Sequence, residues 1–95
     1  MHVYTKKGRQ SPVFLPHEEK TVRFYIEADG RDDVRLEYSF DPGHVRLAQR
    51  VWENFEGGWA GELEGPPTAI RVNIERAKGP VFLWVKTGEQ GEKNA

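Results

Sequence analysis

Aspartates gather in one short segment of this 95-residue chain, at Asp29, Asp32 and Asp33 in the sequence DGRDD. Carboxylate oxygens in a loop are the ligands that hard cations such as Ca²⁺ take. The spacing of a calcium loop is D-x-[DN]-x-[DN]-G, and here Arg31 stands in the middle of the segment instead. Aspartate also favours turns, because its side chain bonds the backbone nearby. The sequence therefore predicts a turn at this position and no metal site.

Groups for nucleophilic or acid–base catalysis form no recognisable constellation. The chain has no cysteine, which excludes thiolate nucleophiles, thiolate metal sites and disulfides. Ser11 and Ser39 lack the G-x-S-x-G elbow, and the three histidines lack the spacing H-E-x-x-H of a zinc site. The Gly-rich GGWAGELEG lacks the Lys-Ser/Thr ending of a phosphate-binding loop. We therefore expect a protein that is not an enzyme and that has no catalytic residues and no cofactor.

Tryptophans offer a different chemistry, the stacking of an aromatic ring on a ligand. Trp59 lies in the Gly-rich segment EGGWAG. It could serve as a platform for a sugar, with Trp52 as a second platform, or it could close one end of the core as a lid. A carbohydrate-binding module that uses these two tryptophans is thus one alternative for the function.

Alternation of apolar and polar residues with a period of two indicates the elements that position these side chains. The evidence for a strand is strongest in TVRFYIEA (21–28), VRLEYSF (34–40), TAIRVNIER (68–76) and GPVFLWVK (79–86). It is weaker in HVRLAQRVW (44–52), WAGELEG (59–65), VYT (3–5) and PVFLP (12–16). Turn signals from Gly, Pro and Asp separate them. Seven to eight short strands predict an all-β protein, a single antiparallel β-sandwich of the jelly-roll or Ig-like type over residues 1–95, with a short polar tail at 87–95.

The inward positions of these segments predict the hydrophobic core. Its members are Val22, Phe24, Ile26, Val34, Leu36, Tyr38, Val45, Leu47, Ile70, Val72, Ile74, Val81, Leu83 and Val85.

The last strand, GPVFLWVK, differs from the others because it has no polar face. Side chains alternate along a strand, so Phe82 and Trp84 point away from the core. A sandwich strand normally has one hydrated face, so these two side chains predict contact either with another protein chain or with loops of the same chain. Tyr25, Trp52 and Arg71 share the outward parity and, if their strands are neighbours, complete a partner-binding patch.

Charge and hydropathy exclude two classes of partner. The chain carries 14 basic and 15 acidic residues, a net charge of −1, which lacks the positive footprint of a nucleic-acid-binding protein. No apolar run approaches the roughly 20 residues of a membrane span, and the N-terminus lacks the apolar stretch of a signal peptide. The absence of cysteine fits a reducing compartment such as the cytoplasm. A content of 31% charged residues, rich in Glu and Arg, is compatible with a thermostable protein.

The order of segments in residues 33–87 resembles small bacteriophage virion β-sandwich proteins of the decoration, neck or tail accessory type. The resemblance is carried by the hairpin LEYSFDPGHV and by LEGPPTAIRVNIERAKGPVFLWVKT, which is similar to the closing strand pair of such domains. The segment WENFEGGW departs from that pattern. The resemblance implies a structural component of a virion, assembled in the host cytoplasm, that binds copies of itself or other virion proteins in a homo- or hetero-oligomeric assembly.

Overall fold

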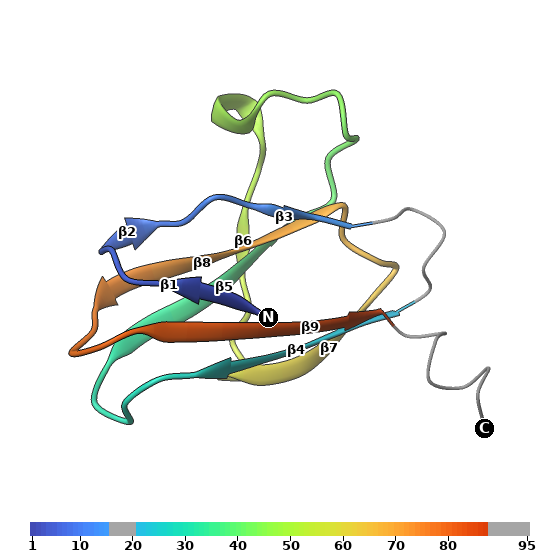
Figure 1. The fold of residues 1–95 in the computed structure, drawn as a ribbon. Coiled ribbons are helices and arrows are strands. Elements are labelled where there is room, and N and C mark those ends of the chain that lie inside the picture. Colours follow the sequence, from blue (N-terminus) through green and yellow to red (C-terminus); the bar gives the residue numbers. More distant parts are fainter. Residues whose placement is uncertain (16–20, 88–95) are drawn as a thin grey trace, which may run out of the picture.

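The computed structural model describes residues 1–15 and 21–87, and these form two antiparallel β-sheets that face each other (Figure 1). Sheet A has the strand order β1 (His2–Tyr4), β9 (Val81–Thr87), β4 (Thr21–Glu27) and β7 (Ala60–Glu64). In sheet B, β2 (Gly8–Arg9) and β3 (Val13–Phe14) both pair with β8 (Ala69–Arg76), which is followed by β5 (Asp33–Ser39) and β6 (Glu53–Asn54). The predicted all-β sandwich is confirmed.

The pairings between strands are nested around the middle of the chain. β5 pairs with β6, β4 with β7, β2 and β3 with β8, and β1 with β9, and all of these pairs are antiparallel. The pairs fall alternately in sheet B and sheet A. If β2 and β3 are taken as one interrupted strand, this is the arrangement of an eight-stranded jelly roll. The strand order thus distinguishes between the two sandwich types that the sequence allowed.

The core lies between the sheets and follows from the alternation of the long strands. Buried apolar side chains are Val22, Phe24, Ile26, Val34, Leu36, Leu63, Ala69, Ile70, Val72, Ile74, Val81 and Leu83. Tyr38 and Val85 are half-buried and pack against this cluster. Most of the predicted core is therefore confirmed. Val45 and Leu47 are exceptions, because Val45 is only half-buried and Leu47 is 48% exposed.

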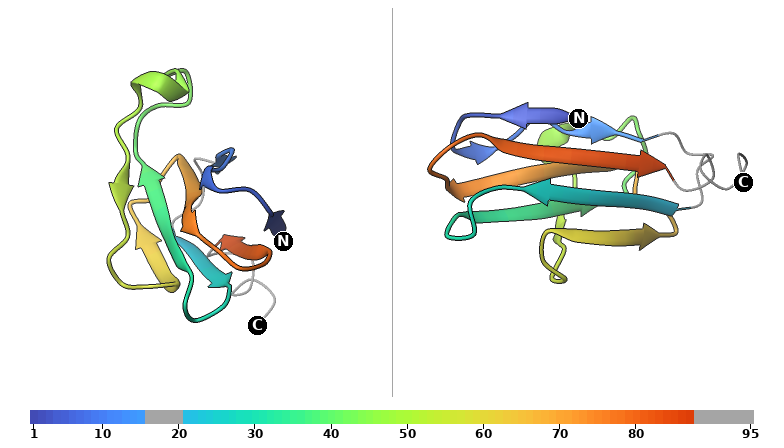
Figure 2. Two further views of the ribbon diagram at one scale, coloured as in Figure 1. Left: turned by 90° about the vertical axis from the view of Figure 1, so that its left-hand side faces the viewer. Right: turned by 60° about the horizontal axis from the view of Figure 1, so that its bottom comes forward.

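The prediction of a strand over HVRLAQRVW is wrong. This segment is a loop with one turn of 3₁₀ helix, η1 (Leu47–Gln49), and it projects beyond the two sheets (Figures 1 and 2). Its fold is determined by Arg50, which is only 6% exposed. The Arg50 guanidinium donates hydrogen bonds to the carbonyl oxygens of Val45 (3.2 Å), Asp41 (3.1 Å) and Pro42 (2.9 Å) and to the hydroxyls of Ser39 (3.2 Å) and Thr68 (3.1 Å). Three of these acceptors share the two hydrogens of Nη1, while Nε and Nη2 serve one each, so a single planar group holds the loop together.

Smaller elements also depart from the expectation. The weak segment WAGELEG does form a strand, β7, whereas β2 and β6 have two residues each and were not predicted. The short segments near the N-terminus become β1 and β3, and β3 lies at an edge of sheet B. Thr87 is the last residue of β9, so the tail predicted at 87–95 does not begin at residue 87. Residues 88–95 of that tail, and Pro16 of the segment PVFLP, lie outside the described residues.

Gly61 on β7 is in contact with the ring of Phe55, which packs edge-on against Phe24 with 4.8 Å between ring centroids. A Cβ atom at Gly61 would collide with the Phe55 ring. We expect Gly61→Ala to reduce the free energy of unfolding by about 1–3 kcal/mol, because it overpacks this end of the core. Urea denaturation measures the change.

Gly43→Ala is the matched control for this substitution. A Cβ atom there meets no heavy atom within 4 Å, so the free energy of unfolding should change by less than about 0.5 kcal/mol. Equal effects of the two substitutions would contradict the close contact of Gly61 with Phe55.

Arg50→Lys tests the anchor of the projecting loop. In this variant a compact ammonium group replaces the planar guanidinium with its five N–H donors, so several acceptors in the loop lose their hydrogen bond. We expect a loss of about 1–3 kcal/mol in the free energy of unfolding. Arg46→Lys, at an exposed position of the same loop, should be neutral. Similar values for both variants, measured by urea denaturation, would show that Arg50 does not anchor the loop.

Candidate functional site

The outer face of sheet A carries a row of aromatic side chains across two central strands. Tyr25 on β4 lies directly opposite Trp84 on β9 in the pairing register, and their side chains are 45% and 46% exposed. Phe82, two residues along β9, is half-buried and lies opposite Val3 of β1, which is exposed. We call Val3, Tyr25, Phe82 and Trp84 the aromatic face. It unites three of the five residues predicted to bind a partner.

Charged residues border the aromatic face along the strand direction. Glu27 lies opposite Phe82 at one end, and Arg23 lies opposite Lys86 at the other. The Arg23 Nε also donates to Glu62 Oε2 on β7 at 2.8 Å. An open depression of about 410 Å³ lies at the basic end, lined by Arg23, Phe24, Tyr25, Trp84, Val85 and Lys86. The face is thus apolar in the middle, with an acid at one end and two bases at the other, one of which is paired with Glu62.

The other two predicted partner-binding residues, Trp52 and Arg71, are on the opposite side of the molecule. Arg71 is on β8, and its guanidinium lies 4.0 Å from the centroid of the Trp52 ring. The Arg71 Nε donates to Glu37 Oε1 at 2.7 Å, and the two side chains are 15% and 7% exposed. The prediction that they form one patch with Trp84 is therefore wrong, because they belong to the outer face of sheet B.

Around Glu37 and Arg71, the outer face of sheet B is covered by side chains of the chain itself, whereas Phe14 on β3 of this sheet is 56% exposed. Glu37 accepts a further hydrogen bond from Asn73 Nδ2 at 3.4 Å, and Arg9 Nε lies 3.6 Å from it. Trp52 lies on this polar cluster through its contact with Arg71. Trp52 is half-buried, and its ring stacks on a cation of its own chain. This face of the ring is therefore not available for stacking on a ligand.

Trp59 has the position of a lid, which was one of the two interpretations of its loop. Its Nε1 donates to the carbonyl of Val34 in sheet B at 2.9 Å, and its own carbonyl accepts from the amide of Ile26 in sheet A at 2.6 Å. The ring is half-buried against the core. Trp59 therefore joins the two sheets, and this geometry does not favour a sugar platform.

The aspartates of DGRDD bind backbone amides. Asp29 Oδ1 accepts from the amide of Arg31 at 2.9 Å, and Asp32 accepts from the amides of Asp29 at 3.1 Å and Lys78 at 3.0 Å. Across residues 1–15 and 21–87, no group of three His, Asp or Glu side chains could hold a metal ion. These contacts are those of a turn and of its link to the β8–β9 turn.

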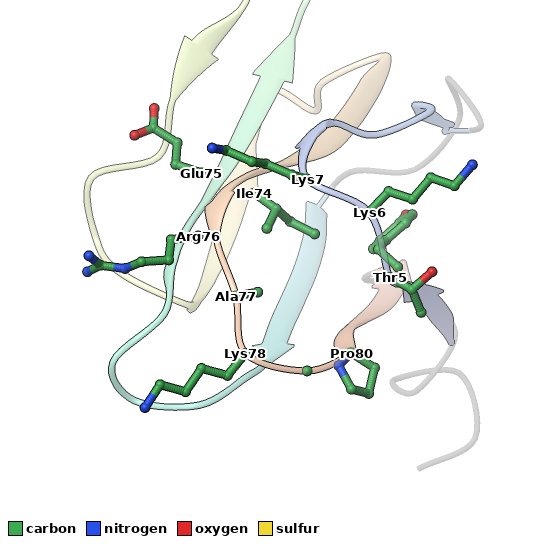
Figure 3. A pocket seen from close by; sticks show the side chains of 11 residues that line it. Thr5, Lys6, Lys7, Ile74, Glu75, Arg76, Ala77, Lys78 and Pro80 are labelled. Carbon is green, nitrogen blue, oxygen red and sulfur yellow. The ribbon is translucent and has the colours of Figure 1, made fainter.

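An opening of about 400 Å³ lies at the end of the sandwich where β1 turns into β2 and β8 into β9. Four cations are among its lining residues, Lys6, Lys7, Arg76 and Lys78, with Glu75 as the acidic member. Figure 3 shows Lys6 pointing to one side of the opening and Arg76 and Lys78 to the other. Burial raises the pKa of the nearby Tyr4 hydroxyl, which keeps it protonated. Cations that diverge do not make a binding site for one anion.

Comparisons with protein-family models, with curated proteins and with solved structures returned no match. Among the described residues there is no helix with the length and apolarity needed to cross a membrane.

Val3 and the depression beside Trp84 were not part of the predicted site. Val3 lies in VYT, whose short length gives no alternation from which to derive an outward face. The β1·β9 pairing places it opposite Phe82, and that pairing has no signal in the sequence.

The different stability of the two outer faces can be measured. Glu37→Ala leaves the mostly buried Arg71 without its carboxylate, and we expect a loss on the order of 3 kcal/mol in the free energy of unfolding. Glu62→Ala breaks the exposed ion pair with Arg23 on sheet A and should cost less than about 1 kcal/mol. Chemical denaturation of both variants gives the comparison, and a larger loss for Glu62→Ala would contradict it.

Proposed function

We propose that this protein is a non-enzymatic binding component that docks onto another protein chain through the aromatic face. The observation that carries this proposal is the difference between the central strands of the two sheets. Trp52 covers the polar cluster on sheet B, whereas Tyr25 and Trp84 on sheet A stay nearly half exposed among the described residues. Figure 2 (right) shows β9 and β4 side by side in this sheet, with the projecting loop behind them.

The composition of the face suits a protein partner. Interfaces are enriched in aromatic side chains and Arg at their centre and are bordered by a polar rim. Here Tyr25 and Trp84 form the centre, and Arg23, Glu27 and Lys86 form the rim. Leaving adjacent large aromatic groups in water on a monomer has a free-energy cost that docking removes.

We further propose, on the resemblance of residues 33–87, that the docking serves a virion, in which the protein is a decoration, neck or tail accessory component assembled in the host cytoplasm. The jelly-roll order is compatible with this role, since capsid proteins use the fold, but lectins and cupins use it as well. The proposal of docking therefore rests on the aromatic face, and the virion role on the resemblance.

The alternative of a carbohydrate-binding module was based on Trp59 and Trp52. Both are held by their own chain, Trp59 through its hydrogen bond to Val34 and Trp52 through Arg71. The geometry thus gives this alternative less support than protein docking.

Trp84→Glu tests the proposed function. A charge in the centre of a docking surface should weaken binding about 30-fold or more, because a buried carboxylate there has no partner. The immobilised protein is incubated with an extract of the cells or particles in which it occurs, and quantitative mass spectrometry compares the proteins captured by wild type and variant. Circular dichroism and thermal unfolding show that the variant is folded.

Leu47→Glu is the matched control, because Leu47 is a similarly exposed apolar residue on the projecting loop. It should retain the captured protein, and Tyr25→Glu should lose the same one as Trp84→Glu. Capture that is lost with Leu47→Glu and kept with Trp84→Glu would assign docking to the loop and refute the proposal.

A further inference from the structure

Two charges of β4 are arranged symmetrically about Tyr25, although one of them, Arg23, also pairs with Glu62 of its own chain. Along β4, Glu27 lies two residues to one side and Arg23 two residues to the other, and all three point outward. On β9, Lys86 lies beside Arg23 at the basic end. Residues two apart in a strand are about 6.6 Å apart, so the acid and the base are at equal distances from the aromatic pair.

This arrangement is complementary to itself in one orientation. Consider two copies facing each other, related by a two-fold axis that lies in the interface and runs across the strands through Tyr25 and Trp84. The rotation reverses the strand direction, so Glu27 of each copy comes over Arg23 of the other, and Lys86 comes over Phe82, beside that Glu27. A two-fold axis along β4 would instead place Glu27 on Glu27 and Arg23 on Arg23, and one between β4 and β9 would place Arg23 on Lys86, so that like charges repel each other.

From this complementarity we propose that the occupant of the aromatic face is a second copy of this chain, docked face to face with its strands antiparallel. The inference rests on the proposed function and names its partner. Tyr25 and Trp84 stack at the centre of the dimer, and two equivalent clusters of Glu27 with Arg23 and Lys86 flank them. Packed sheets commonly cross at about 30°, which leaves these long side chains within reach of each other.

The size of the face sets the expected strength of the dimer. The four strands of sheet A lie about 4.8 Å apart and are roughly six residues long, so the flat outline of the sheet covers about 400 Å². Each partner in a standard interface buries roughly 800 Å² of accessible surface. The dimer is therefore weak, and its population rises with protein concentration and falls with added salt.

Charge reversal provides the test, with sedimentation equilibrium of the intact chain at up to about 1 mM and low ionic strength as the measurement. Arg23→Glu places a carboxylate at both position 23 and position 27, and Glu27→Arg places a guanidinium at both. Each variant alone should dimerise at least tenfold more weakly than wild type. An equimolar mixture should form a heterodimer, because position 23 of each chain then faces a position 27 of opposite charge, and the double variant R23E/E27R should regain the dimer for the same reason.

Arg35→Glu is the matched control, because Arg35 is an exposed arginine on the outer face of sheet B. It should leave the dimerisation constant unchanged. Thermal unfolding of each variant identifies any that fails to fold, and the mixture and the double variant keep the test decisive, since a folding defect would not be repaired by the opposite charge.

The outcomes also separate this inference from the proposed function. A wild-type monomer throughout the concentration range, or a dimer indifferent to both reversals, overturns the second copy as occupant. If such a monomer still captures a different protein in a way that depends on Trp84, the docking function stands with another partner. If its tryptophan fluorescence instead responds to oligosaccharides and this response requires Trp84, the face binds carbohydrate, and both proposals fail.

Discussion

The structure depends on one constraint, the nested pairing of strands about the loop at residues 40–52. The chain doubles back once at this loop, and the resulting ribbon of strand pairs wraps into two layers, so that successive pairs fall alternately in sheet B and sheet A. Wrapping places β4 beside β9, although more than half of the chain separates them in sequence. The pairing of Tyr25 with Trp84, and with it the aromatic face, exists only because of this arrangement.

The outer faces of the two sheets differ in the burial and pairing of their side chains. On sheet B, a buried carboxylate is neutralised by arginine, and an aromatic ring from the segment before β6 stacks on that arginine. The buried Glu37 carboxylate on this face is paired inside the chain, as buried charges require, whereas the buried Nε1 of Trp52 has no hydrogen-bond partner among the described residues. On sheet A the ion pair of Arg23 with Glu62 is exposed, and apolar rings lie next to it. Tyr25 and Trp84 on this sheet therefore stay nearly half exposed to water.

Much of the fold could be predicted from the sequence, because the four long strands alternate strictly and one sandwich core requires that pattern. The error at HVRLAQRVW has a physical cause. Its apolar residues alternate as in a strand, but Arg50 finds five acceptors in a loop and would have had fewer on a sheet surface. For the site, parity correctly placed Tyr25, Phe82 and Trp84 on outward positions of strands that form. Trp52 was placed outward by the parity of a strand that does not form. Parity also does not state which sheet a strand joins, so it could not separate Arg71 on β8 from the aromatic face.

The nested pairing also determines where the chain could be joined and where it could be opened. Since β1 pairs with β9, the first and last described strands are neighbours in sheet A. The projecting loop at the tip carries no strand pairing and is closed locally by Arg50. A chain joined at its base by a short linker and cut open near His44 would keep every strand neighbour of the original. Circular permutation would thus change where the chain begins and ends without changing which strands pair.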